Sequence, residues 1–178
     1  FSSHNNSNQS SHSILTSDSL MMSPRMSDGV SGCKFCEITR HKKEIHLRES
    51  DNCVLIRDIK PKAPQHFLVI PKVHIAKPTD LTIADKDLLN EMEKLGREYL
   101  RIELKEKGEA DTVEDMLRVG FHWPPMVRVN HLHLHVIYPI KELSFMSKVL
   151  TFKPGKVFKT LPKVMEVLEK KGNLKDEK

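Results

Sequence analysis

The sequence predicts an α+β fold, with an antiparallel sheet of about five strands, one long helix and a C-terminal helix. Two observations carry this prediction. Short apolar runs of strand length recur along the chain, separated by prolines and charged residues. Among them lies a single long stretch whose apolar residues follow helical spacing. Strands that gather around one helix, rather than alternating with several, favour an antiparallel sheet.

Four strand candidates follow one another along the chain. The first two, 54–56 and 66–70, are joined by a connection that contains two prolines, so a hairpin is expected. The third covers 116–119 and the fourth covers 129–138. Between these two, residues 122–125 are expected to form a rigid loop, because their two prolines fix φ and donate no ladder hydrogen bond.

The long helix is expected between Thr82 and Gly108. Thr82 and Asp85 have the spacing of a capping box at its start, and Gly108 suits its end. An apolar stripe runs along it, formed by Leu88, Met92, Leu95 and Tyr99. The C-terminal helix is expected at 162–171, with one apolar face formed by Val164, Val167 and Leu168.

The composition divides the 178 residues into three parts. Residues 1–31 hold eleven serines and little that is apolar, so this segment is expected to be disordered. Residues 32–140 are expected to form the domain. Residues 141–178 are a lysine-rich extension with ten lysines and five acids, which accounts for the whole net charge of +5. A solvated helix face and a contact with nucleic acid or another polyanion are alternative interpretations of this extension.

Composition also excludes several classes of protein. No run approaches the roughly 18 apolar residues of a membrane helix, so no membrane association is expected. Three cysteines in a chain of this length do not make a disulfide scaffold. The pair Cys33-x-x-Cys36 indicates metal or redox chemistry in a reducing compartment, so we expect the protein in the cytoplasm, the nucleus or both.

The most informative segment alternates three histidines with apolar residues. Because neighbouring side chains of a strand point to opposite faces, His131, His133 and His135 should share one face. The intervening Leu132, Leu134 and Val136 should then face the core. Imidazole is a nucleophile that titrates near neutrality, and a row of three can bind and attack a phosphoryl group. A metal site and an ordinary polar strand face are alternative interpretations.

This segment resembles the signature of the histidine triad (HIT) family of nucleotide hydrolases and transferases. Residues 58–74 look like the long N-terminal block of that family. Residues 120–125 look like the branch of histidine triad nucleotide-binding protein 3, which is close to aprataxin. The resemblance covers about residues 33–138, with weaker similarity to about Leu168.

The resemblance implies a role for each residue that matches the family's motif. His133 would attack the α-phosphorus of a nucleoside phosphoramidate and form a covalent nucleotidyl-histidine, which water then cleaves. His131 and His135 would contact the phosphate and help the leaving group. Asp58 would bind the ribose, since a carboxylate can accept from both hydroxyls.

A hydrophobic slot for the base is also implied by the resemblance. Its lining would be Phe35, Ile38, Ile56, Ile59 and Leu68, although an ordinary core is the alternative. The sequence departs from the family at two positions near the phosphate: Gly120 stands where many relatives carry Asn, and Arg128 where many carry Ser. Arg128 would then bring a charged donor to the nucleotide in place of a hydroxyl.

A structural zinc ion, and no organic cofactor, is implied as well. The proposed ligands are Cys33, Cys36, His74 and His131, a set of N and S donors that suits tetrahedral zinc. An unmetallated thiol pair and a redox pair are the alternatives, and His41 and His46 are alternative ligands.

Together these features predict a nucleoside (adenosine) 5′-monophosphoramidase that acts on purine nucleotides of the AMP type, as a homodimer. One alternative is an aprataxin-like hydrolase of adenylated nucleic-acid ends. It is disfavoured because aprataxin-like enzymes carry a zinc finger after this domain, and no Cys or His follows His135. A second alternative is a nucleotide-binding interaction protein with little turnover.

Overall fold

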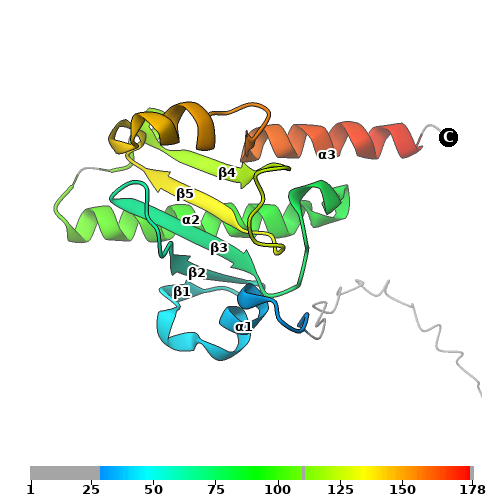
Figure 1. Ribbon diagram of the computed structural model, residues 1–178, viewed down its shortest axis with the longest axis horizontal. Helices are drawn as coiled ribbons and strands as arrows, with labels where there is room; N and C mark the ends of the chain where they lie inside the picture. Colours follow the sequence, from blue (N-terminus) through cyan, green and yellow to red (C-terminus); the bar gives the residue numbers. More distant parts are fainter. Residues whose placement is uncertain (1–28, 110, 177–178) are drawn as a thin grey trace, which may run out of the picture.

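The computed structural model of the protein describes residues 29–109 and 111–176. The predicted disordered segment therefore lies almost entirely outside the described residues. The described part is α+β, as predicted, with a six-stranded antiparallel sheet of strand order β1-β2-β3-β5-β4-β6 (Figure 1). The strands are β1 (Arg48–Glu49), β2 (Cys53–Arg57), β3 (Gln65–Pro71), β4 (Arg118–His122), β5 (Leu134–Tyr138) and β6 (Phe158–Thr160).

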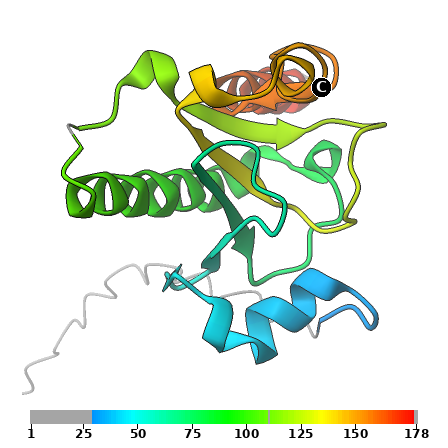
Figure 2. The ribbon, with the colours of Figure 1, turned by 60° about the vertical axis from the view of Figure 1, so that its left-hand side comes forward.

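Three helices surround this sheet. They are α1 (Lys34–His41), α2 (Lys86–Glu106) and α3 (Leu161–Asp176). Helix α2 lies across one face of the sheet, while α1 lies beyond the β1–β2 side and α3 lies on the β4 side (Figures 1 and 2). Short helical turns occupy Lys43–Ile45, Pro78–Asp80, Ile83–Asp85, Glu114–Met116, Ile140–Glu142 and Ser147–Thr151.

Helix α2 begins and ends at the predicted signals. The Asp85 carboxylate accepts hydrogen bonds from the backbone N–H of Thr82 at 2.8 Å and from its hydroxyl at 2.9 Å. Gly108 follows the helix at a φ of +69°, a conformation that favours glycine. The predicted stripe packs on the sheet, with Met92 and Leu95 buried. This packing makes the main core.

The two faces of the sheet separate by strict alternation along each strand. On β3, Phe67 and Val69 belong to the main core under α2, whereas Leu68 and Ile70 point the other way. That second face carries two smaller apolar clusters. One contains Phe35, Val54, Ile56, Leu68 and Ile70, and the other contains Ala63, Ile137, Leu143, Phe152 and Phe158.

Two strand predictions need correction. Strand β4 begins at Arg118 and continues to His122, which was expected in a loop. Strand β5 begins only at Leu134, because the segment before it bonds elsewhere: the backbone N–H of Leu132 donates to the carbonyl of Ile75 at 2.6 Å. His131 therefore precedes β5, although its side chain keeps the predicted alternation.

Strand β6, which pairs with β4 at the edge of the sheet, is not among the strands expected from the sequence. This strand has only three residues and includes Lys159, so it shows no apolar run. Helix α3 follows directly, and its Leu161, Val164 and Leu168 are buried in the main core. The boundary placed at residue 140 thus divides one sheet, and the described part of the extension belongs to the fold. In residues 29–109 and 111–176, no helix is long and apolar enough to span a membrane.

Candidate active site

The reaction centre is built on β5 and on the three residues that precede it. Leu132, Leu134 and Val136 lie in the main core, as the alternation predicts. The rings of His133 and His135 therefore point to the other face, with their centroids 5.0 Å apart. The backbone of one short segment thus fixes the spacing between the two imidazoles.

One hydrogen bond orients the ring of His133 and leaves its other nitrogen unprotonated. Its Nδ1 lies 2.7 Å from the carbonyl oxygen of His131, a group that can only accept, so Nδ1 carries the proton and donates it. Burial lowers the pKa of His133, which keeps the ring neutral at neutral pH. A neutral imidazole protonated at Nδ1 carries a lone pair on Nε2, as a nucleophile requires.

His135 is held in the opposite tautomer by His66, a residue outside the site predicted from the sequence. The backbone N–H of Lys62 donates to His66 Nδ1 at 3.1 Å, so the proton of neutral His66 is on Nε2. That Nε2–H donates to His135 Nδ1 at 2.9 Å. The proton of His135 therefore lies on Nε2, a buried atom without a hydrogen-bond partner.

Burial favours these neutral states, although the charge of Asp58 acts in the opposite direction on His66. Burial lowers the pKa of His66 to about 4, and it holds the pKa of His135 well below its usual range. The carboxylate of Asp58 lies 3.4 Å from His66 Nε2, and its other oxygen accepts the backbone N–H of Lys60 at 2.8 Å. His66 could have been noticed in the sequence as an ionisable residue within an otherwise apolar strand.

His131, which was expected both at the phosphate and among the metal ligands, lies with the metal ligands. Its Nε2 lies 2.9 Å from the carbonyl oxygen of Pro71, and its Nδ1 lies 3.4 Å from the sulfur atoms of both Cys33 and Cys36. The residue is fully buried. Both ring nitrogens of His131 therefore have partners within the protein, and its contact with the phosphate stays a prediction. The backbone carbonyl of His131 accepts the hydrogen bond from Nδ1–H of His133.

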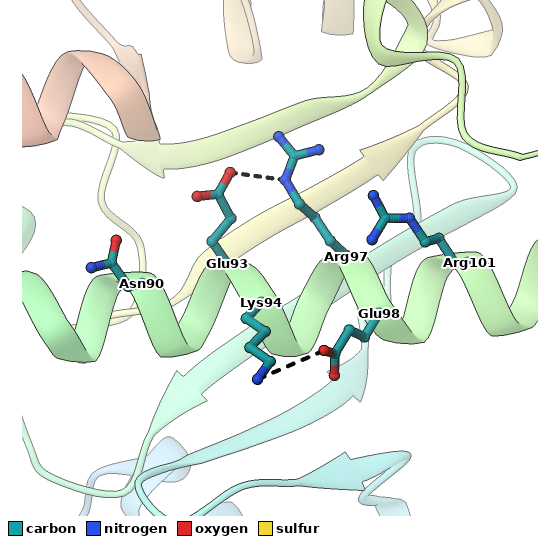
Figure 3. A pocket seen from close by; sticks show the side chains of 6 residues that line it. All are labelled: Asn90, Glu93, Lys94, Arg97, Glu98 and Arg101. Carbon is teal, nitrogen blue, oxygen red and sulfur yellow. Dashed lines mark hydrogen bonds and ion pairs between the residues drawn. The ribbon is translucent and has the colours of Figure 1, made fainter.

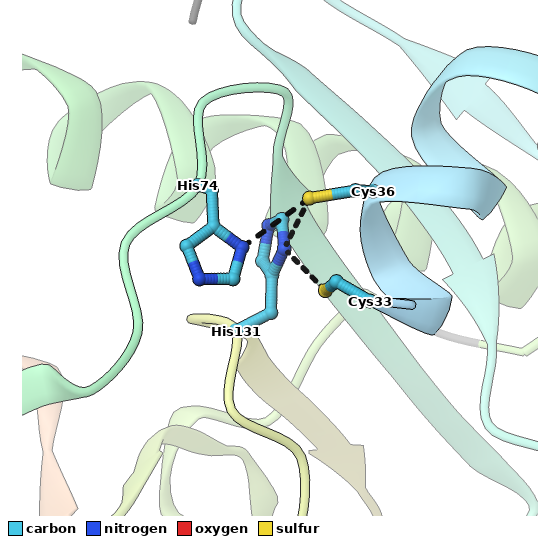
Figure 4. A group of neighbouring side chains, drawn as sticks. All are labelled: Cys33, Cys36, His74 and His131. Atoms are coloured by element: carbon cyan, nitrogen blue, oxygen red, sulfur yellow. Dashed lines mark hydrogen bonds between the residues drawn. The ribbon is translucent and has the colours of Figure 1, made fainter. Parts of the chain in front are cut away.

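The four predicted metal ligands converge at one point (Figure 4). Their ligand atoms lie within 4.8 Å of one another, and His74 Nδ1 is 3.2 Å from the sulfur of Cys36. Tetrahedral zinc, with bonds of about 2.3 Å to sulfur and 2.0 Å to nitrogen, separates such atoms by about 3.5 Å. The donor set fits, and the Pro71 carbonyl that holds the far nitrogen of His131 is a typical outer partner of a metal-bound histidine.

The alternative ligands lie outside this group. His46 uses its two nitrogens for the Glu49 carboxylate at 2.7 Å and the Ile38 carbonyl at 2.9 Å. His41 is exposed. Cys53 is buried in the main core, on the face of the sheet covered by α2. Of the described cysteines, only Cys33 and Cys36 therefore meet histidines.

Most of the predicted base slot comes together beside His133. Phe35, Ile56 and Leu68 share one apolar cluster with the half-buried Ile38. The ring of Phe35 meets the ring of His133 edge to face at 5.2 Å. Ile59 does not join them, since it is 88% exposed on the connection after β2. Arg128 is exposed on the segment that links β4 to β5.

Gly120 lies opposite His135 in the β4–β5 pairing and next to β6. A Cβ atom at this position would collide with the carbonyl oxygen of Lys159 and come within 2.7 Å of the Phe158 ring. Strand β6 therefore fills the space that a side chain would need.

A separate groove runs along the outer side of α2 (Figure 3). It is lined by Asn90, Glu93, Lys94, Arg97, Glu98 and Arg101. Ion pairs join Glu93 to Arg97 and Lys94 to Glu98 within it. It contains neither imidazole nor thiol, so the chemistry belongs to the histidine face.

Known proteins resemble this chain in both sequence and structure. Residues 32–151 match the family model described as scavenger mRNA decapping enzyme C-term binding. Adenosine 5′-monophosphoramidase HINT3 of Mus musculus is 36% identical over 143 residues, which cover 79% of this chain and 83% of that protein. Bifunctional adenosine 5′-phosphosulfate phosphorylase/adenylylsulfatase HINT4 of Arabidopsis thaliana is 41% identical over 106 residues, 58% of this chain and 67% of that protein. A solved histidine triad protein from Clostridium difficile superposes with a TM-score of 0.51 at 27% identity, over 62% of this chain and 93% of that one.

Proposed function

Since this chain belongs to the histidine triad family, we propose that it is a hydrolase that cleaves adenosine 5′-phosphoramidates to AMP and an amine. One observation carries the proposal: His133 offers an unprotonated Nε2 next to the unpartnered Nε2–H of His135. A nucleophile and a neutral hydrogen-bond donor thus meet on one face. The phosphoramidase names of similar proteins agree with this chemistry.

The reaction follows from this pair in two steps. Nε2 of His133 forms a bond to the α-phosphorus while the phosphorus–nitrogen bond breaks, and the departing nitrogen takes one proton from solvent water to leave as the neutral amine. The Nε2–H of His135 donates to a phosphoryl oxygen, where negative charge develops. Water then attacks the same phosphorus and gives one proton to solvent, while the bond to His133 breaks and its Nε2 regains the lone pair. AMP leaves with the oxygen of that water, and the two steps together consume one water molecule.

The nucleoside part of the substrate is bound next to this pair. Asp58 would accept hydrogen bonds from the ribose hydroxyls, and its carboxylate is already fixed at the end of β2 by the backbone N–H of Lys60. The base would lie against the apolar cluster that contains Phe35, Ile56 and Leu68. Ile59 is exposed and lies outside this cluster, so it would contact the base only at the edge of the slot.

The test is turnover of a fluorogenic adenosine phosphoramidate, with mass spectrometry of the quenched enzyme to find AMP on His133. We expect AMP as product and adenylylated His133 in a rapid quench. Wild-type protein that binds AMP without turning over the substrate would point to the interaction-protein alternative. Turnover of adenylated DNA ends, but not of the phosphoramidate, would point to the aprataxin-like alternative.

We propose further that Cys33, Cys36, His74 and His131 bind zinc. The ion would be structural, since it would tie the start of α1 to the segment before β5. The convergence of two thiols and two imidazole nitrogens supports this assignment. The residues already hold their arrangement through the Pro71 carbonyl and the helix that presents Cys36.

We also propose that the protein is a homodimer of the cytoplasm or nucleus. The three cysteines are free thiols, which suits a reducing compartment. Sedimentation velocity at micromolar concentration tests the dimer, and a monomer at every concentration would contradict it. Fluorescence imaging of the tagged full chain tests the location.

A further inference from the structure

One peptide unit links the cysteine pair to the nucleophile. The ring of His131 lies beside both thiols, with its Nδ1 3.4 Å from the sulfur atoms of Cys33 and Cys36 (Figure 4). The backbone carbonyl of the same residue accepts the 2.7 Å hydrogen bond from Nδ1–H of His133. Any change that turns the ring of His131 therefore acts on the bond that orients the nucleophile.

The other side of that peptide unit is held from the same place. Its N–H, which belongs to Leu132, donates to the carbonyl oxygen of Ile75 at 2.6 Å. Ile75 directly follows His74, whose Nδ1 lies 3.2 Å from the sulfur of Cys36. The two histidines that meet the thiols thus hold this peptide unit from both sides.

A second connection runs through the ring of Phe35. This residue lies between the two cysteines, at the start of helix α1. Its ring centroid is 5.9 Å from that of His131 and 5.2 Å from that of His133. Phe35 also belongs to the apolar cluster that is proposed to hold the base. A change in the spacing of the cysteines therefore also moves one wall of the base slot.

The cysteine pair can be reached from outside the domain. A cavity beside helix α1 is lined by both cysteines and by residues 29–32. All three cysteines are free thiols, and among them only Cys33 is partly exposed. Cys53 is fully buried on the face of the sheet covered by α2. A small oxidant therefore reaches Cys33 first and does not reach Cys53.

The hydrogen bonds of His131 make its position depend on the state of the thiols. Its Nε2 lies 2.9 Å from the carbonyl oxygen of Pro71, which can only accept, so Nε2 carries the proton and Nδ1 a lone pair. A thiol can donate its S–H to this lone pair, and a bound metal ion can coordinate it. A disulfide offers neither a hydrogen nor a charge. Oxidation therefore leaves the buried Nδ1 without a partner, which is unfavourable.

We propose that Cys33 and Cys36 form an oxidation site through which hydrogen peroxide lowers turnover at His133. The thiol of Cys33 attacks the peroxide, the O–O bond breaks, and a sulfenic acid and one water form. The thiol of Cys36 then attacks that sulfur, so that the S–S bond forms and the hydroxyl group leaves as a second water.

Two thiols and one hydrogen peroxide thus give one disulfide and two waters. The two sulfur atoms lie within 4.8 Å of each other and approach to about 2.0 Å when they bond. A bound zinc ion would be released, because two of its four ligands are lost, and the two protons would then come from solvent. The proposal rests on the proposed function, since it concerns regulation of that same site.

The first measurement is chemical and does not depend on turnover. The full chain, prepared without chelator, is treated with hydrogen peroxide and analysed by mass spectrometry of unreduced peptides. We expect a disulfide between Cys33 and Cys36, with Cys53 still a thiol. A metal-sensitive dye should report zinc release at the same rate. Reduced Cys33 and Cys36 in protein that has lost its activity would overturn the proposal.

The second measurement follows the effect on the site. We expect the disulfide form to show a kcat about 10- to 100-fold lower, because a displacement of about 1 Å near the chemistry can cost this much. AMP binding should weaken about 3- to 10-fold, as for loss of part of an aromatic contact. Dithiothreitol with zinc should restore both values.

Two variants are compared by the ratio of treated to untreated activity. Cys53→Ala should stay as sensitive to peroxide as the wild type. The double variant Cys33→Ser/Cys36→Ser should be insensitive, whatever activity it retains without two metal ligands. If the double variant does not fold, as judged by thermal unfolding, Cys36→Ser takes its place, since it cannot form the disulfide either.

Three other outcomes would overturn the proposal. Full turnover by the disulfide form would show that the pair does not act on His133. An equal loss in the double variant would place the damage elsewhere in the chain. Loss of the far-ultraviolet circular dichroism on oxidation would mean unfolding rather than a local change. Wild-type protein without phosphoramidase turnover would remove the proposed function, while the disulfide and the AMP affinity of the oxidised form would still decide the oxidation site.

Discussion

The backbone carbonyl of His131 accepts a hydrogen bond of 2.7 Å from Nδ1–H of His133. The bond leaves Nε2 as the only nucleophilic nitrogen of His133. We expect His133→Asn to lower kcat about 10⁴-fold or more, because an amide cannot form the covalent intermediate. AMP affinity measured on the same preparation should remain, which separates chemistry from binding. Substantial single-turnover activity in this variant would refute the assignment of the nucleophile.

His66 should matter for turnover although it is not in the histidine motif. We expect His66→Phe to lower kcat about 100-fold, because His135 loses the partner that keeps its proton on Nε2. Steady-state kinetics should show the loss mainly in kcat rather than in KM. His46→Phe is the matched control, since His46 also has a buried side chain but lies outside the histidine face. Similar losses in both variants would argue against a specific role for His66.

Acid should destabilise the fold through the buried ring of His66. The pKa of His66 is about 4 in the folded state, against an ordinary value of 6.5, and burial is the main cause. Between these pH values the unfolded state binds more protons, so the free energy of unfolding falls as the pH drops from about 6.5 towards 4. Urea denaturation across this range should show a weaker pH dependence for His66→Leu than for the wild type. Carboxylates contribute to both proteins, so identical pH dependences would contradict the prediction.

Metal content should depend on the cysteine pair but not on the third cysteine. We expect wild-type protein to contain about one equivalent of zinc, as for a single site with four ligands. Cys36→Ser should lose most of it and unfold at a lower temperature. Cys53→Ala should keep the metal, since Cys53 lies on the other face of the sheet. Elemental analysis of protein prepared without chelator makes the measurement, and less than about half an equivalent in the wild type would exclude the site.

The packing of β6 should make a measurable contribution to stability. Phe158 is fully buried, so we expect Phe158→Ala to lower the free energy of unfolding by about 3–5 kcal/mol. Phe145→Ala is the matched control, since Phe145 is 77% exposed, and its effect should stay within about 0.5 kcal/mol. Equal effects would mean that the C-terminal segment is not part of the core in solution.

The sequence predicted those parts of the fold that local patterns encode. The capping residues Thr82 and Asp85 and the stripe on α2 are local signals, and the structure confirms them. Strand β6 could not be predicted, because a three-residue strand with a lysine at its centre shows no apolar pattern. Its position depends on pairing with β4, a contact distant in sequence.

In the candidate site, too, local patterns could be predicted and contacts between distant parts of the sequence could not. The motif correctly placed the histidines on one face, and the donor types correctly brought Cys33 and Cys36 to two histidines. Which nitrogen of each ring is free could not be predicted, because it depends on a carbonyl of Pro71 and on the backbone of Lys62. Pro71 lies 60 residues from His131, and His66 lies 69 residues from His135, so no local pattern shows these contacts. Which of the two roles predicted for His131 its ring can serve depends on these same partners.

The crowded position of Gly120 limits how this chain can change. The resemblance to relatives with Asn there suggests that one substitution would convert this site to theirs. The carbonyl of Lys159 and the ring of Phe158 fill the space, so any side chain at this position would first have to displace β6. Displacing β6 would also remove the ring of Phe158 that packs against His122. Position 120 and strand β6 are therefore coupled, so that a larger residue at the one requires a rearrangement of the other.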